Sequence, residues 1–232
     1  MNPAIPPSRA RAARLAVTAL FIANGAISAS ILTRTPALKA GLGLSDGELG
    51  IVLAVWPVGG LLAGGLAGIL IARFGSGRLA IATGLLAAAA LVAIGVATSW
   101  AMLVVSMLVL GMFEATMDTA MNAHSIGVQR LYGRSILQGF HGMWSVGSMA
   151  LGAVGALVAG AGVPVPVHLA LVAAGVALTV MVAARGMLPT ALADAPHASG
   201  EDQPLSLAVM PRILRVLVPI ALLGVLLSLI HI

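Results

Sequence analysis

Two acidic side chains stand inside an apolar stretch, 102–123, that carries no other charge. Glu114 and Asp118 are four residues apart, so in a helix they lie on one face. Counted inward from residue 102 at about 1.5 Å per residue, they lie about 18 Å and about 24 Å deep. Burial and a neighbouring like charge both disfavour the ionised form, so we expect at least one acid to carry a proton near neutral pH. We predict a role in proton coupling. The alternative is a pair of acids that only tie helices together.

A histidine in the next apolar stretch is the third candidate for proton coupling. His141 lies about 7.5 Å above the inner edge at about 1.5 Å per residue, which is near the level of Asp118. Consecutive helices are often neighbours, and imidazole titrates near neutrality, so we predict a relay between the two side chains. His141 as a purely hydrogen-bonded residue is the alternative. Asn122, His124 and Gln138 are interpreted as interfacial residues at the inner mouth.

Three further residues are expected at the level of Glu114. Asn24 is followed by a glycine, where another backbone or a ligand can approach closely. The family resemblance given below implies a central cavity at this level, and Asn24, Trp144 and Ser145 are candidates for lining it. An ordinary hydrogen bond between helices is the alternative for Asn24. Trp56, beside a proline, is interpreted as shaping its own helix.

The chain has the composition of an integral membrane protein, with 60% hydrophobic and 8% charged residues and a mean hydropathy of +1.09. A bilayer core of about 30 Å needs about 20 helical residues. Six apolar stretches reach that length, and a seventh begins near residue 216 but continues for only about half a crossing. We predict an all-α membrane bundle of six spans and a partial seventh. The six stretches are 15–32, 49–72, 79–97, 102–123, 136–161 and 165–184.

Basic residues orient these spans. With a cytoplasmic N-terminus, ten Lys and Arg residues fall on the inner side and two, Arg34 and Lys39, fall outside. This asymmetry predicts a multi-pass membrane protein with its N-terminus in the cytoplasm. The net charge of +5 then reflects topology, so we expect no nucleic-acid partner. Reading the first span as a signal peptide is the alternative, and it would invert every later loop. The inner residues are Arg9, Arg11, Arg14, Arg73, Arg78, Arg130, Arg134, Arg185, Arg212 and Arg215.

A basic segment, 68–78, joins the second and third spans. We predict a tight hairpin in which Gly75 and Gly77 are free to take positive φ. Arg73 and Arg78 are expected at the lipid headgroups. Gly68, Arg73, Gly75 and Arg78 form the pattern Gly-x-x-x-x-Arg-x-Gly-x-x-Arg.

Six spans with this hairpin resemble the N-terminal half of a major facilitator superfamily (MFS) transporter. Several further segments are similar to the YbjJ-like branch, which is related to fucose permease. The resemblance implies a secondary active transporter of the bacterial inner (plasma) membrane that moves a small solute, such as a sugar or related metabolite, by alternating access. Proton-coupled and facilitative transport are both open. The resemblance also implies a missing C-terminal half. The family's usual acid before the first arginine is Ala72 here, which puts the family's charge relay in doubt. The similar segments are 43–50, 117–123, 132–134 and 140–142.

The chain divides into four expected parts. Residues 1–188 form the six-helix half, 189–215 a cytoplasmic connector, and 216–226 the start of the seventh helix. We interpret 227–232 as translated sequencing adapter at the end of a truncated coding sequence; a genuine C-terminus is the alternative.

Six apolar spans are also compatible with two other function classes. A non-transporting membrane scaffold or sensor is the main alternative. An intramembrane serine protease would use Ser145 with His141 or His168, but Ser145 lacks the Gly-x-Ser-x-Gly setting of such a nucleophile. With no cysteine in the chain, we expect no Cys-based metal site. For a transporter of this kind we also expect no metal or other cofactor and no catalytic residue.

Overall fold

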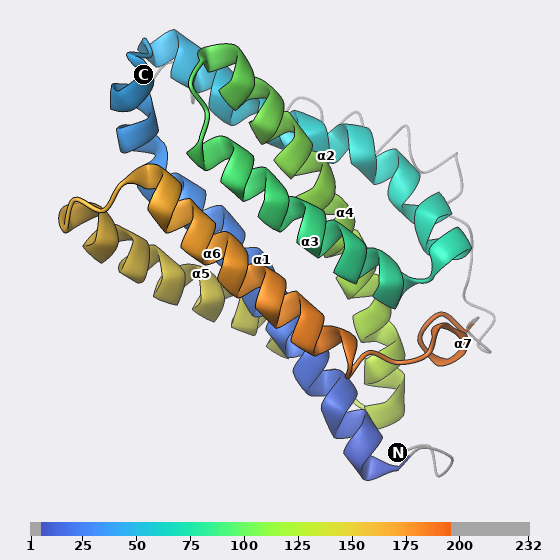
Figure 1. Ribbon diagram of the computed structural model, residues 1–232. Coiled ribbons are helices and arrows are strands. Elements are labelled where there is room, and N and C mark those ends of the chain that lie inside the picture. Colours follow the sequence, from blue (N-terminus) through green and yellow to red (C-terminus); the bar gives the residue numbers. More distant parts are fainter. Residues whose placement is uncertain (1–5, 196–232) are drawn as a thin grey trace. The chain divides into compact units, whose positions relative to one another are not determined.

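A computed structural model describes residues 6–195 of the chain. It confirms the six-helix fold, because each of six long helices is apolar and long enough to cross a membrane, and no strand occurs within these residues. A one-turn helix, α7, follows the sixth. The partial seventh span expected near residue 216 lies outside the described residues. The helices are α1 (Pro7–Leu42), α2 (Asp46–Phe74), α3 (Ser76–Gly95), α4 (Trp100–Tyr132), α5 (Leu137–Gly160), α6 (Val165–Ala184) and α7 (Thr190–Ala193) (Figure 1).

Chain neighbours are mostly not packing partners in this bundle. Helix α4 packs against α2 and α3, whereas α5 packs against α1, and α6 lies beside α3 and α1 (Figure 1). Helices α4 and α5 barely touch each other. The expectation that these consecutive helices pack together is therefore wrong, which removes the basis on which His141 was placed beside Asp118.

Glycines set how closely the paired helices approach. A Cβ added to Gly111 on α4 would lie 2.0 Å from the carbonyl oxygen of Trp56 on α2. A Cβ on Gly25 of α1 would lie 2.4 Å from the carbonyl oxygen of Trp144 on α5. Only glycine permits such backbone contact, because any side chain would overlap the facing carbonyl. These two contacts hold both tryptophans against the helices that carry Asn24 and Glu114.

The basic segment between α2 and α3 is more helical than expected. Helix α2 continues to Phe74 and α3 begins at Ser76, so Gly75 alone, with φ 86°, makes the turn. Gly77 was expected to share the positive φ, but it lies inside α3. The lack of a side chain at Gly77 instead allows close packing, because a Cβ there would lie 3.1 Å from the ring of His124.

Candidate functional site

A cavity of about 290 Å³ lies among helices α1, α2, α4 and α5. We call it the Glu114 cavity. It brings together both predicted acids, the predicted asparagine and one predicted tryptophan. The lining residues are Asn24, Ser28, Trp56, Pro57, Gly60, Gly111, Glu114, Ala115, Asp118 and Trp144.

Glu114 is the most completely bonded group of this cavity. The Ser28 hydroxyl donates to its Oε1 at 2.5 Å, and the Trp56 indole donates to its Oε2 at 2.6 Å. The side chain is 9% exposed, so both bonds form in a setting with little water. The carboxyl group therefore links α4 to α1 and α2 at one point.

Sequence reasoning did not select Ser28, and it assigned Trp56 to the shape of its helix. Ser28 lies four residues after Asn24, hence on the same face of α1, and that spacing was the available signal. For Trp56 the sequence holds no equivalent signal. Its contact with Glu114 depends on the rotation of α2 about its axis and on the close approach at Gly111.

Asp118 lies one turn from Glu114 and is half-buried. Its Oδ1 accepts a hydrogen bond from the Asn122 amide at 3.2 Å, and the same amide donates to the Asp118 carbonyl at 2.8 Å. Among the described residues no hydrogen bond or ion pair joins Asp118 to His141. The His141 ring is instead exposed and packs edge-on against Phe21 of α1, with ring centroids 5.1 Å apart. The relay between Asp118 and His141 stays a prediction without a direct bond.

Asn24 and Trp144 form the other polar pair of the cavity. The Trp144 indole donates to Asn24 Oδ1 at 2.8 Å. Asn24 is 3% exposed, and its Nδ2 atom has no hydrogen-bond partner among the described residues. A buried amide donor without an acceptor is costly, so Asn24 is a polar side chain of this cavity whose hydrogen bonding is incomplete.

Ser145 does not line this cavity. Its side chain is exposed, and its hydroxyl donates at 3.3 Å to the backbone carbonyl of His141, not to an imidazole. The other histidine considered for a protease, His168, accepts a bond from Arg34 Nε at Nδ1, at 2.7 Å. Among the described residues, Ser145 is thus hydrogen-bonded to neither of the two histidine side chains considered as its base.

A second polar group, the basic-end cluster, consists of Ser76, His124, Arg130 and Asp194 at the end where α2 meets α3. His124 was expected at an open mouth, but it is fully buried. The Leu188 backbone N–H donates to its Nε2 at 3.1 Å, so Nδ1 carries the proton and donates to Ser76 Oγ at 3.0 Å. His124 is thus buried in the bundle, while its interfacial depth in the bilayer stays a prediction.

The basic-end cluster also holds the chain that follows α6. The Asp194 carboxylate accepts a bond from the Ser76 backbone N–H at 2.9 Å and so caps the start of α3. Arg130 donates to the carbonyls of Ala193 and Ala195, each at 2.6 Å. An acid from beyond α6 thus stands at this helix start, close to the hairpin in which Ala72 replaces the expected one.

Gly68, Arg73 and Arg78 of the basic segment are exposed. The Arg73 guanidinium lies 5.4 Å from the centre of the Phe74 ring. Gly75 is buried and faces the hydroxyl of Thr190 in α7. The segment is therefore an exposed arginine surface with one buried turn residue.

A sequence model of the Major Facilitator Superfamily matches residues 15–231, which is most of the chain. The chain belongs to this superfamily. The predicted resemblance is thereby confirmed at the level of the superfamily, and the six apolar helices make this member a multi-pass membrane protein.

Three known proteins are similar in sequence to part of this superfamily member. An uncharacterised transporter, y4wD, of Sinorhizobium fredii is 29% identical over 143 residues, or 62% of this chain and 38% of the relative. An uncharacterised MFS-type transporter of Yersinia pestis is 34% identical over 140 residues, or 60% of this chain and 36% of the relative. The membrane protein MosC of Rhizobium meliloti is 32% identical over 140 residues, or 59% of this chain and 34% of the relative. The matched part thus spans between a third and two fifths of each relative.

Proposed function

We propose that this chain is the N-terminal half of a secondary active transporter that moves a small solute by alternating access. The observation that carries the proposal is the Glu114 cavity, a polar space among four apolar helices with a buried carboxyl group. Ionisable groups inside membrane spans are costly and mark solute or proton pathways. Binding between the two halves of a transporter near the midplane is the general pattern.

The exposed faces of α2 and α5 support the need for a second half. In the most apolar window of each helix, 17% of the residues of α2 and 11% of those of α5 are buried, against 67% for α1. Both helices contribute a tryptophan to the Glu114 cavity. We infer that a C-terminal half covers this side and completes the cavity, while lipid covers the remainder.

The bonds of Glu114 support the proposal of proton coupling. An indole N–H can only donate, so Oε2 must stay an acceptor, and a proton on the carboxyl group belongs on Oε1. The Ser28 hydroxyl can either donate to Oε1 or accept from it. Rotation of one hydroxyl therefore lets Glu114 gain or lose a proton while its bond to Trp56 remains. Asp118, one turn away and open to the cavity, is the proposed next proton carrier, with His141 beyond it.

The proposed solute is a sugar or a related polar metabolite. The cavity offers aromatic surfaces from Trp56 and Trp144, a free amide donor from Asn24 and an acceptor on Asp118. Hydroxyl groups of a sugar both donate and accept hydrogen bonds, and its C–H faces pack on indole rings. The YbjJ-like branch and its relation to fucose permease stay a prediction.

Transport is tested with the full-length transporter reconstituted in vesicles that contain a pH-sensitive dye. A panel of monosaccharides and sugar acids should include a solute that drives proton movement. Glu114→Gln should abolish that movement, because the amide cannot release a proton. Glu48→Gln, which changes an exposed acid at the start of α2, is the matched control and should leave it intact. Unchanged coupling in Glu114→Gln would remove Glu114 from the mechanism.

Orientation is tested with single cysteines, since the chain has none of its own. We propose that the N-terminus and the arginine-rich end face the cytoplasm. In intact cells an impermeant thiol reagent should then label Ala161→Cys, at the turn between α5 and α6. It should not label Arg134→Cys, at the turn between α4 and α5. The opposite pattern would invert the proposed topology.

A further inference from the structure

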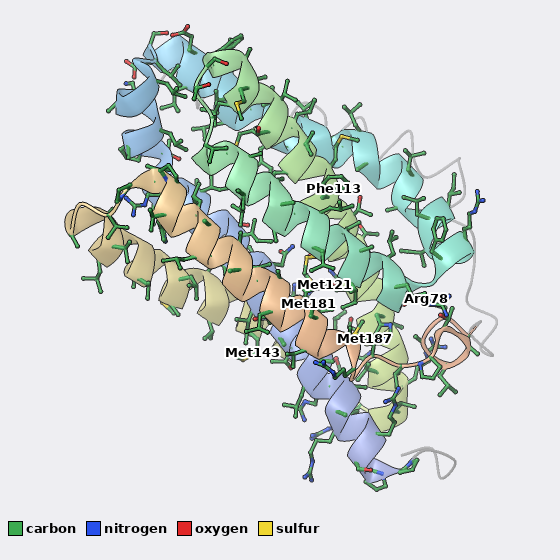
Figure 2. The ribbon with its side chains drawn as sticks, viewed as in Figure 1. Arg78, Phe113, Met121, Met143, Met181 and Met187 are labelled. Carbon is green, nitrogen blue, oxygen red and sulfur yellow. The ribbon has the colours of Figure 1, made fainter. Side chains whose placement is uncertain are left out.

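A second, larger cavity lies on the arginine-rich end of the bundle, between α3 and the chain that leaves α6. Its volume is about 650 Å³, and it is separate from the Glu114 cavity. Arg9 and Arg78 both line it, and Figure 2 shows Arg78 at the α7 end of α3. We call it the Arg9–Arg78 groove.

The charge of this groove is unbalanced. Of the described residues that line it, none is acidic. Arg9 is half-buried and donates through Nη2 to the Met187 carbonyl at 2.7 Å, which fixes its guanidinium at the wall. Arg78 makes no hydrogen bond or ion pair with the residues that the structure describes. Two guanidinium groups on one groove without a carboxylate favour an anion, because each still has free N–H donors in a fork that matches phosphate oxygens.

The groove continues from its charged end into an apolar strip. Arg78, Ile81, Ala82 and Leu85 line it at spacings of three, four and seven residues, so they share one face of α3. From the arginine to the leucine the strip runs about 10 Å along the helix axis. Ala184 of α6 and Met187 are its facing wall. A ligand that fits must be anionic at one end and apolar beyond it.

We propose that the Arg9–Arg78 groove binds one anionic phospholipid from the adjoining leaflet. The phosphate group lies between the two guanidinium groups, and one acyl chain follows the strip of Ile81, Ala82 and Leu85. Basic pockets between membrane helices recognise anionic headgroups by this combination of charge and depth. The Thr190 hydroxyl, also on the groove, is a further donor to the headgroup. Because the same groove is lined by the segment after α6, the bound lipid stabilises that segment against the bundle.

Native mass spectrometry of the purified 232-residue chain in detergent tests this proposal. The probes are phosphatidylglycerol, phosphatidylcholine and inorganic phosphate, each titrated separately. Phosphatidylglycerol should be retained at one molecule per chain in preference to phosphatidylcholine. Arg78→Gln should weaken its retention about fivefold. Arg134→Gln removes the same charge from an exposed site at the same end, outside the groove, and should change retention little.

Ala82→Trp tests the apolar half, because it fills the strip while both arginines remain. It should also reduce phosphatidylglycerol retention, and helical circular dichroism checks that the variants remain folded. Equal weakening by Arg78→Gln and Arg134→Gln would show diffuse attraction to the basic end and would overturn the proposal. So would equal retention of the two lipids. Binding of inorganic phosphate as tight as that of the lipid, or full retention in Ala82→Trp, would show a free-anion site instead.

Discussion

The Glu114 cavity and the basic-end cluster are both built from polar side chains of apolar helices, yet they differ in completeness. In the basic-end cluster each ring nitrogen of His124 has a partner, and the Asp194 carboxylate caps α3. In the Glu114 cavity the carboxyl group has two partners, but the Asn24 amide keeps a donor with none, next to about 290 Å³ of space.

This difference separates a structural role from a binding role. A buried polar network with every described ring nitrogen and carboxylate in use can only lose stability when a member is removed. A network with one donor free and space beside it can gain a ligand. Charge alone does not distinguish them, since both groups contain an acid. The number of unused donors does.

The largest effect is expected from His124→Ala in the basic-end cluster. The change leaves the Ser76 hydroxyl and the Leu188 N–H without a buried partner and opens a cavity between them. We expect a loss of about 3 kcal/mol in the free energy of unfolding. Thermal unfolding in detergent, followed by circular dichroism, measures it. His141→Ala is the matched control, because that ring is exposed, and it should cost less than about 1 kcal/mol. Similar losses in the two variants would contradict the structural role of His124.

The two regions also differ in how far the sequence predicts them. Six apolar stretches of sufficient length were enough for the six helices. Hydropathy did not predict where the helices begin and end, because α1 and α4 include polar sequence. Helix α1 begins at Pro7, and α4 ends at Tyr132. Depth counting placed Asn24, Trp144 and Ser145 near the level of Glu114, and the structure has Asn24 and Trp144, but not Ser145, on the cavity that Glu114 and Asp118 line. Their roles stay predictions.

The partners of these residues could not be predicted in the same way. Depth is set by position along one helix, but a contact depends on which helices cross and on their rotation. Thus Ser28 and Trp56 were missed at Glu114, and His141 was paired with an acid on a helix that α5 barely touches. The buried state of His124 depends on a segment 64 residues further along the chain. No local pattern marks a contact of that range.

A smaller effect is expected from Asp194→Ala, which removes the cap of α3 but leaves His124 in place. The Ser76 backbone N–H then loses its acceptor, and the start of α3 loses a favourable negative charge. We expect a cost of about 1 kcal/mol in the free energy of unfolding. Asp46→Ala is the matched control at the start of α2, where the acid is exposed and pairs with Lys39. A larger loss in Asp46→Ala would show that Asp194 does not stabilise the basic-end cluster.

The smallest effect on stability is expected from Glu114→Gln, although its effect on function should be complete. The glutamine carbonyl still accepts from the Trp56 indole, and its amide still donates to the Ser28 hydroxyl, so the free energy of unfolding should change by less than about 1 kcal/mol.

Trp56 provides a direct readout of the protonation of Glu114, because its indole senses the charge on Glu114 through their bond. With Trp100 and Trp144 replaced by phenylalanine, the fluorescence of the chain should vary with pH. Glu114→Gln should remove that variation, and Glu48→Gln should not. A pH response that survives in Glu114→Gln would mean that a different group titrates beside Trp56, and it would remove Glu114 as the proposed proton carrier.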